Sequence, residues 1–199
     1  LAALAALAGY RLFFEKAGQK ASSSSSFVSQ EEEAPLSAAE YRAVWISYLE
    51  YEGMDFSSAQ SLRAQVAQMM ENCASLGLSR VVVQVRPFGD ALYPSAIFPW
   101  SHLITGVQGG DPGYDPFEIF VEEAHAHGLA IEAWVNPYRV QLTASKPAQL
   151  AQNNPAVLHP EWALSSGGGK YYDPSNQQVR DLITQGVLEL VKGYEIDGV

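Results

Sequence analysis

From residue 41 onward, short β-branched runs alternate with longer segments of helical periodicity. Four runs rich in Val, Ile and aromatic residues are typical of strands: 41–47, 79–86, 129–136 and 195–199. Between them, apolar residues recur every three or four positions, which predicts three amphipathic helices. Capping residues or prolines open these helices at Ser58, Asp115-Pro116 and Asp173-Pro174. Repeated strand–helix units of this kind predict an α/β fold with a parallel sheet.

The two faces of the predicted strands differ in polarity, and this difference selects between sheet types. In the second run, Gln84 and Arg86 alternate with three valines: Val81, Val83 and Val85. The run 129–136 repeats the pattern, whereas the strands of an open doubly wound sheet read as almost continuously apolar. A polar face that opens toward the strand ends is typical of a (β/α)8 TIM barrel, which usually needs about 250 residues. We therefore expect residues 41–199 to form the first half of such a barrel, about four βα units.

The first forty residues differ from the rest of the chain. Residues 1–14 are dominated by Leu, Ala and aromatic residues, which predicts the tail of a signal peptide or an uncleaved signal anchor, with an ordinary amphipathic helix as the alternative. Residues 15–40 are rich in Ser and Glu and predict a flexible linker. The chain begins without Met and stops inside a strand-like run, so we expect a piece of a longer protein. This order predicts an extracytoplasmic protein, anchored or secreted, that contacts the membrane through its N-terminal segment only.

Charge and cysteine content exclude several function classes. Twelve Lys and Arg against 22 Asp and Glu give a net charge of −10, which disfavours nucleic-acid binding. The single cysteine, Cys73, excludes an intramolecular disulfide and a multi-cysteine zinc site. His125 and His127 are two residues apart in a predicted helix and so do not share a face. We therefore expect no metal and no cofactor, and the oligomeric state stays open.

Candidate site residues follow the second and third predicted strands, where barrel enzymes carry their chemistry. Arginine suits carboxylates or sugar hydroxyls, asparagine pairs with hydroxyls, and aromatic rings stack on pyranose faces. The substrate-binding candidates are Arg86, Tyr93, Trp134, Asn136, Tyr138 and Arg139, beside the carboxylate of Asp90. Together they predict a sugar-binding surface. The alternative is that Arg86 and Asp90 only stabilise their loop and that Trp134 packs inside the barrel.

Several long motifs resemble one bacterial family. They are RAVWIS, VVVQVRPFGDALYPSAIFPWSHLITGVQGGDPGYDP, IEAWVNPYR, HPEW, YYDPSNQQVRDLI and YEIDGV, in order from Tyr41 to the last residue. Together they resemble glycosyl-hydrolase-like family 10, also called domain of unknown function 187. The resemblance implies a TIM-barrel domain, usually exported, with members acting on the glycan strands of peptidoglycan. The family's barrel-mouth motifs fall on Asp90 and the six substrate-binding candidates, whereas Glu132 stands where many members have His.

These observations lead to one functional hypothesis and two alternatives. We expect an extracytoplasmic glycoside hydrolase that acts on a polysaccharide such as the glycan strands of peptidoglycan. Hydrolysis needs two carboxyl groups about 5–9.5 Å apart, with Asp90 and then Glu132 as the candidates and further carboxylates expected beyond Val199. The alternatives are a non-catalytic glycan-binding barrel and a scaffold docked on the cell wall. Acidic residues at the ends of later strands would favour the enzyme.

Overall fold

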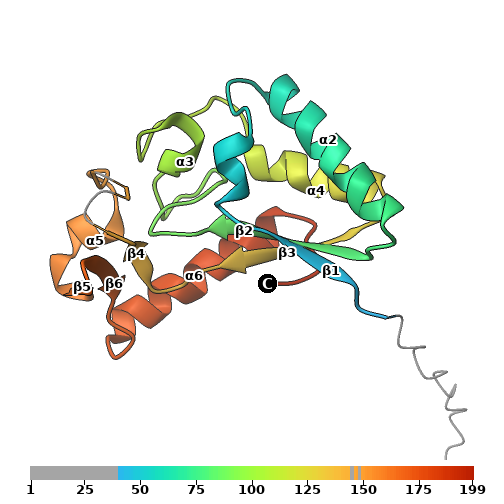
Figure 1. Cartoon of the computed structure of the whole chain (residues 1–199). Coiled ribbons are helices and arrows are strands. Elements are labelled where there is room, and N and C mark those ends of the chain that lie inside the picture. The colour runs from blue at the N-terminus through green and yellow to red at the C-terminus, as the bar shows by residue number, and fades with distance from the viewer. Residues whose placement is uncertain (1–39, 144–145, 148) are drawn as a thin grey trace, which may run out of the picture. The chain divides into compact units, whose positions relative to one another are not determined.

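The computed structural model describes residues 40–143, 146–147 and 149–199 (Figure 1). The predicted anchor and nearly all of the predicted linker lie outside the described residues. Within the described residues, none of the helices combines the length and the apolar character needed to cross a membrane.

Three parallel strands form the main sheet, in the order β1 (Ala43–Ile46), β2 (Arg80–Arg86) and β3 (Ala130–Val135). The fourth predicted strand begins beside β3, since Asp197 N–H donates to the Ile131 carbonyl at 2.8 Å and Ala133 N–H donates to the Gly198 carbonyl at 2.9 Å. Each strand of the main sheet therefore pairs with the strand that follows it in this sheet. A doubly wound sheet reverses its strand order, whereas a barrel wall does not. The fold is α/β with the strand order of a partial (β/α)8 barrel.

The three predicted helices are α2 (Ala59–Ser75), α4 (Pro116–Ala126) and α6 (Gln177–Gly193). Ser58 caps α2 through the Ser61 N–H, and Asp115 caps α4. The start of α6 differs from the prediction. Asp173 accepts the Ser175 N–H in a preceding turn, and Asn176 caps the helix, because its side chain accepts the Gln178 N–H.

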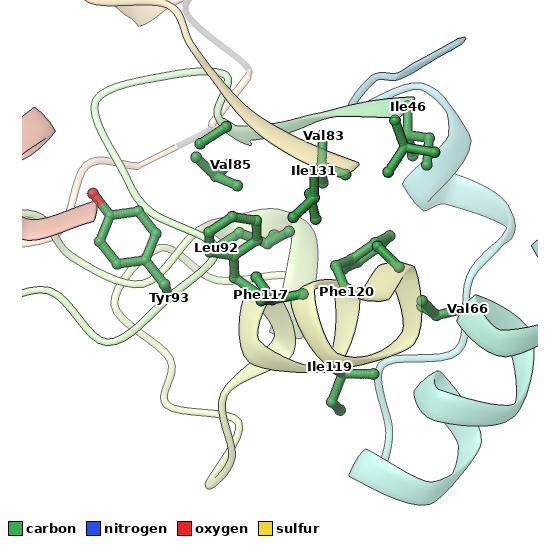
Figure 2. Packing of buried hydrophobic residues seen from close by; sticks show 14 of the residues in the cluster. Ile46, Val66, Val83, Val85, Leu92, Tyr93, Phe117, Ile119, Phe120 and Ile131 are labelled. Atoms are coloured by element: carbon green, nitrogen blue, oxygen red, sulfur yellow. The ribbon is translucent and has the colours of Figure 1, made fainter. Parts of the chain in front are cut away.

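The aliphatic face of the sheet packs against the helices. Figure 1 shows α2 and α4 side by side over β1–β3. Figure 2 shows Val83, Val85 and Ile131 pointing toward the aromatic rings of α4, Phe117 and Phe120, and all five side chains are fully buried. The predicted aliphatic layer is therefore the core, and the opposite face of the sheet carries the polar side chains.

A small antiparallel sheet lies in the connection between β3 and α6, outside the four runs that the sequence pattern predicts as strands. Its strands are β4 (Arg139–Gln141), β5 (Ala163–Ser166) and β6 (Gly169–Tyr172), in the order β4-β6-β5. The described connections also hold short helical turns: η1 (Glu50–Gly53), α3 (His102–Thr105), α5 (Pro155–Leu158) and η2 (Pro160–Trp162). Val140 and Tyr172 of this sheet are buried with Val179 of α6, so the insertion has its own small core.

Gly186 allows α6 to approach β2. A Cβ at this position would lie 2.6 Å from Nη1 of Arg86 and 2.7 Å from Cε2 of Phe98. We expect Gly186→Ala to lower the free energy of unfolding by about 1–3 kcal/mol, because the added methyl group overpacks the contact. Urea denaturation of the full chain measures the loss. Gly193→Ala is the control, since a Cβ there meets nothing within 4 Å, and an equal loss in both variants would contradict the packing argument.

Asp197 ties the fourth strand to β3 through its carboxylate, because Oδ2 accepts the Ile131 N–H at 2.8 Å. This hydrogen bond and the nearby His125 hold the pKa of Asp197 below its ordinary value of 3.8. A lowered pKa stabilises the fold above the ordinary value, and the contribution disappears as the pH falls through the lowered one.

We therefore expect Asp197→Asn to lower the melting temperature at neutral pH and to flatten its decline between about pH 5 and pH 3. Thermal melts across that range measure both effects. Asp181→Asn, at an exposed position on α6, is the control and should leave the profile unchanged. A profile for Asp197→Asn that parallels the wild type would contradict the role of this carboxylate.

Candidate functional site

Two tryptophans lie on the face of the sheet that the helices do not cover. Trp45 of β1 is 70% exposed, and its ring lies against Trp134 of β3 with the centroids 5.3 Å apart. The indole N–H of Trp134 donates to Oδ1 of Asn136 at 3.0 Å. This contact fixes the amide just beyond the end of β3 beside an aromatic surface.

The Pro87 carbonyl joins the connection after β2 to that after β3. It accepts from Nδ2 of Asn136 at 3.3 Å and from Nε of Arg139 at 2.8 Å. The Arg139 guanidinium also lies over the Phe88 ring at 4.9 Å and the Tyr48 ring at 5.5 Å. The structure thus brings three predicted residues, Trp134, Asn136 and Arg139, to one surface at the carboxyl ends of the strands. We call these three residues the mouth face.

Tyr138 belongs to the same segment and keeps 39% of its surface exposed. Its carbonyl accepts the Tyr172 N–H at 2.7 Å, which ties the segment to β6. The ring is therefore accessible on a backbone that is held in place.

Glu132 lies in a groove of ≈ 440 Å³ lined by Tyr41, Trp45, Val82, Trp134, Val135 and Val199. Its carboxylate accepts from Nη1 of Arg80 at 2.7 Å and from the Tyr41 hydroxyl at 3.1 Å. Arg80 opens β2 and Tyr41 precedes β1, so these partners hold Glu132 toward the amino ends of the strands. In TIM barrels, residues at the amino ends of the strands contribute to stability, whereas catalytic residues lie at the carboxyl ends. The catalytic role of Glu132 stays a prediction, and its placement favours a structural one.

Asp90 is completely buried in the connection after β2. Its Oδ2 accepts from Nε2 of Gln108 at 3.0 Å and lies 3.1 Å from Nδ1 of His102. The Gln108 carbonyl oxygen in turn accepts from Nδ2 of Asn154 and from the Ala151 N–H. This network matches the alternative that Asp90 stabilises its loop. A catalytic role for Asp90 stays a prediction.

Arg86 departs from the alternation that the sequence predicts. Its pairing with β3 shifts register between Gln84 and Arg86, and such an irregularity re-aims a side chain. The guanidinium is fully buried against Phe98 and Gly186, on the side of the helices, and not beside Gln84 on the polar face. Burial lowers the pKa of Arg86.

Tyr93 is also in the interior. Its ring lies 6.4 Å from that of Phe117 and 5.8 Å from that of Tyr194. Burial raises the pKa of Tyr93. Of the predicted substrate-binding residues, Arg86 and Tyr93 therefore lie away from the mouth face, and their contact with a substrate stays a prediction.

The sequence pattern does not indicate the partners of these groups. His102, Gln108 and Asn154 surround Asp90, and Tyr48 and Phe88 support Arg139. The motif between residues 81 and 116 contains His102 and Gln108, but its spacing does not link them to Asp90. Only the folded chain brings Asn154 to the same place.

Among the described residues, no cluster of three or more His, Cys, Asp or Glu side chains could hold a metal ion. His125 of α4 and His127, which follows the helix, have separate partners, since His125 faces Asp197 and His127 contacts the Glu123 carbonyl.

The strand order defines a barrel-type α/β domain, with the polar and aromatic mouth face at the carboxyl ends of its strands. The Glycosyl hydrolase-like 10 family matches residues 40–199, and the chain belongs to this family. It is 39% identical over 163 residues to the glycosyl hydrolase YngK of Bacillus subtilis strain 168, covering 80% of this chain and 32% of YngK. It is 41% identical over 151 residues to the glycosyl hydrolase DigH of Escherichia coli K12, covering 69% of this chain and 34% of DigH. The chain thus spans about a third of the length of these curated relatives.

Solved structures of glycosidases resemble the chain more distantly. The GH36 α-galactosidase AgaA of Geobacillus stearothermophilus gives a TM-score of 0.49 at 20% identity, covering 78% of this chain and 20% of that one. The galactosidase domain of AgaSK gives 0.48 at 14% identity, covering 81% and 21%. The fold assignment rests on the strand order.

Tyr138 is exposed and Tyr93 is buried, so substitution by Ala should change the stability of the protein differently at the two positions. We expect Tyr138→Ala to change the free energy of unfolding by less than about 1 kcal/mol, as at other exposed positions. Tyr93→Ala should cost about 3–5 kcal/mol, because it empties a buried aromatic site. Urea denaturation of both variants of the full chain makes the comparison. A large loss for Tyr138→Ala would place its ring in the core and exclude it from ligand contact.

Proposed function

We propose that the protein hydrolyses O-glycosidic bonds of a polysaccharide outside the cytoplasmic membrane, with peptidoglycan glycan strands as the substrate class. Membership of a glycosyl-hydrolase-like family supports the reaction class. The observation that carries the proposal is the mouth face, where Trp134, Asn136 and Arg139 lie together at the carboxyl ends of the strands. Barrel enzymes bind their substrates at this end.

Each group of the mouth face suits one part of a sugar. The Trp134 ring offers an apolar surface for a pyranose face, and Asn136 offers an amide that both donates and accepts. Arg139 supplies a cation on a chain with a net charge of −10, so it is placed to meet a carboxylate or a hydroxyl of the substrate. Tyr138 extends this surface with an exposed ring.

The reaction needs a general acid and a second carboxyl group, which acts as a base or as a nucleophile. Asp90 and Glu132 are the candidates in the described part of the chain. Both accept hydrogen bonds from other side chains, Asp90 from Gln108 and Glu132 from Arg80 and Tyr41. This observation favours, as the second candidate function, a barrel that binds glycan without cleaving it, including one that docks on the cell wall as a scaffold.

Turnover separates the enzyme from the binder. We expect the full-length protein to release soluble sugars from purified glycan strands. Trp134→Ala should raise KM at least about tenfold, equivalent to about 1.4 kcal/mol of binding free energy, because it removes the aromatic surface on which a sugar ring would stack. Trp134→Phe, which keeps an aromatic ring, is the matched variant and should retain most of the affinity. Binding of the strands without released product would instead support the binder.

Asp90→Asn tests whether this carboxylate is catalytic or structural. A catalytic Asp90 requires kcat to fall at least about 100-fold while the melting temperature is unchanged. The buried contacts with Gln108 and His102 lead us to expect the other outcome, a lower melting temperature with activity lost in step with the folded fraction. Thermal melts and kinetics on the same preparation decide between them. Loss of kcat in a fully folded variant would return Asp90 to the catalytic pair.

A further inference from the structure

Six buried polar atoms without a hydrogen-bond partner belong to four residues: Nε, Nη1 and Nη2 of Arg86, Oδ1 of Asp90, and the hydroxyls of Tyr93 and Tyr172. In the described part of the chain, the other side-chain atom in this condition is Nε of Arg80. Buried polar groups are nearly always hydrogen-bonded, so a set of six calls for a common explanation.

Arg86 interacts electrostatically with the other three residues. Its charge acts on Tyr93, Tyr172 and Asp90, yet none of these makes a hydrogen bond with the guanidinium. Figure 2 shows the Tyr93 hydroxyl pointing away from the hydrophobic cluster. The Tyr172 hydroxyl lies near Gly89, the residue before Asp90, since a Cβ on Gly89 would be 3.4 Å from it. Asp90, Tyr93 and Tyr172 therefore lie in the same part of the interior as Arg86.

The guanidinium of Arg86 has little freedom to move toward a hydrogen-bond partner, because neighbouring groups confine it. The Phe98 ring covers it with its centroid 3.5 Å from Cζ, and the backbone of α6 at Gly186 approaches Nη1 closely. A buried cation without any hydrogen bond is too costly for a stable fold. Since no side chain or backbone group among the described residues hydrogen-bonds to the guanidinium of Arg86, a small molecule is needed to supply the hydrogen bonds.

We propose that ordered internal water bridges Arg86 to Oδ1 of Asp90 and to the hydroxyls of Tyr93 and Tyr172. Water fits the donor set, because it accepts from the guanidinium and donates to the carboxylate in the same position. The four residues also provide the two to four polar partners that a buried water needs.

Charge balance selects water over an anion. Arg86 and Asp90 together carry no net charge, and the carboxylate of Glu189 also acts on Arg86, so a bound chloride would place an uncompensated negative charge in the interior beside carboxylates. Buried charges are stable only when they are paired. A water molecule is neutral, and it would link the guanidinium of Arg86 to the carboxylate of Asp90 through hydrogen bonds.

The bridge gives Arg86 and Asp90 a structural role that holds for an enzyme and for a binder alike. Oδ2 of Asp90 already accepts from Gln108, and the bridge occupies Oδ1, so the carboxylate is fully engaged inside the protein. The pair then anchors the connection after β2, whose Pro87 carbonyl supports Asn136 and Arg139.

A crystal structure of the full chain, grown with sodium bromide and at a resolution that shows single waters, tests the site directly. We expect at least one water within hydrogen-bond distance of both a guanidinium nitrogen of Arg86 and Oδ1 of Asp90. An anomalous bromide peak at the site, or a direct bond between Arg86 and Asp90, would overturn the proposal.

Replacing Tyr172 with Phe removes the hydroxyl and leaves the ring in the core, which allows a test in solution. We expect Tyr172→Phe to raise the unfolding equilibrium constant about fivefold, because it removes a hydrogen bond to the water. Tyr51→Phe is the reference, since the Tyr51 hydroxyl donates directly to the Gln84 carbonyl at 2.9 Å. If Tyr172→Phe leaves stability unchanged or raises it while Tyr51→Phe lowers it, the Tyr172 hydroxyl has no bound water and the proposal fails.

A double-mutant cycle of Arg86→Met and Asp90→Asn measures the coupling across the bridge. We expect each single substitution to raise the unfolding constant at least about 100-fold, and the double variant to fall at least about tenfold short of the product. Arg86→Met combined with Glu71→Gln on α2 is the control pair and should be multiplicative. A multiplicative Arg86–Asp90 cycle would contradict the bridge, and the Tyr172→Phe comparison stands if the single variants do not fold.

Discussion

The connections after β2 and β3 depend on each other for their buried polar groups, and this dependence organises the mouth of the domain. The Gln108 amide is the centre of the network, since it donates to Asp90 and accepts from Asn154. In a low-dielectric interior each of these groups would be costly without its partner. The two connections therefore fold as one unit, and the Pro87 carbonyl can hold Asn136 and Arg139 in fixed positions.

The elements that burial alone determines could be predicted from the sequence. The valines of β2 alternate because one face of a strand packs against helices, and Ser58 and Asp115 begin helices because their side chains cap free N–H groups. The sheet β4-β6-β5 could not be predicted in this way. Its strands have three or four residues and include Ser, Gly and Lys, too short and too polar for a two-residue period to appear.

The candidate site could be predicted only where position along a strand fixes position in space. The positions of Trp134 and Asn136 follow from the end of β3, and the two side chains hydrogen-bond to each other. The direction of Arg86 could not be predicted, because it depends on a register shift against β3 that local sequence does not encode. The burial of Asp90 depends on His102, Gln108 and Asn154, which lie 12, 18 and 64 residues further along the chain. Those contacts form only when distant segments of the chain fold together, so local sequence does not indicate them.

This division between interior and surface constrains how the proposed function could work. Arg86 and Asp90 carry opposite charges but are both completely buried, so neither can attract a ligand from solution as the fold stands. Arg139 is partly exposed, and the Phe88 and Tyr48 rings orient its guanidinium. On an acidic domain, a cation held in this way concentrates positive potential at the mouth while the surrounding surface repels anions. Recognition of an acidic sugar would therefore depend on Arg139, and recognition of a neutral sugar on Trp134 and Asn136.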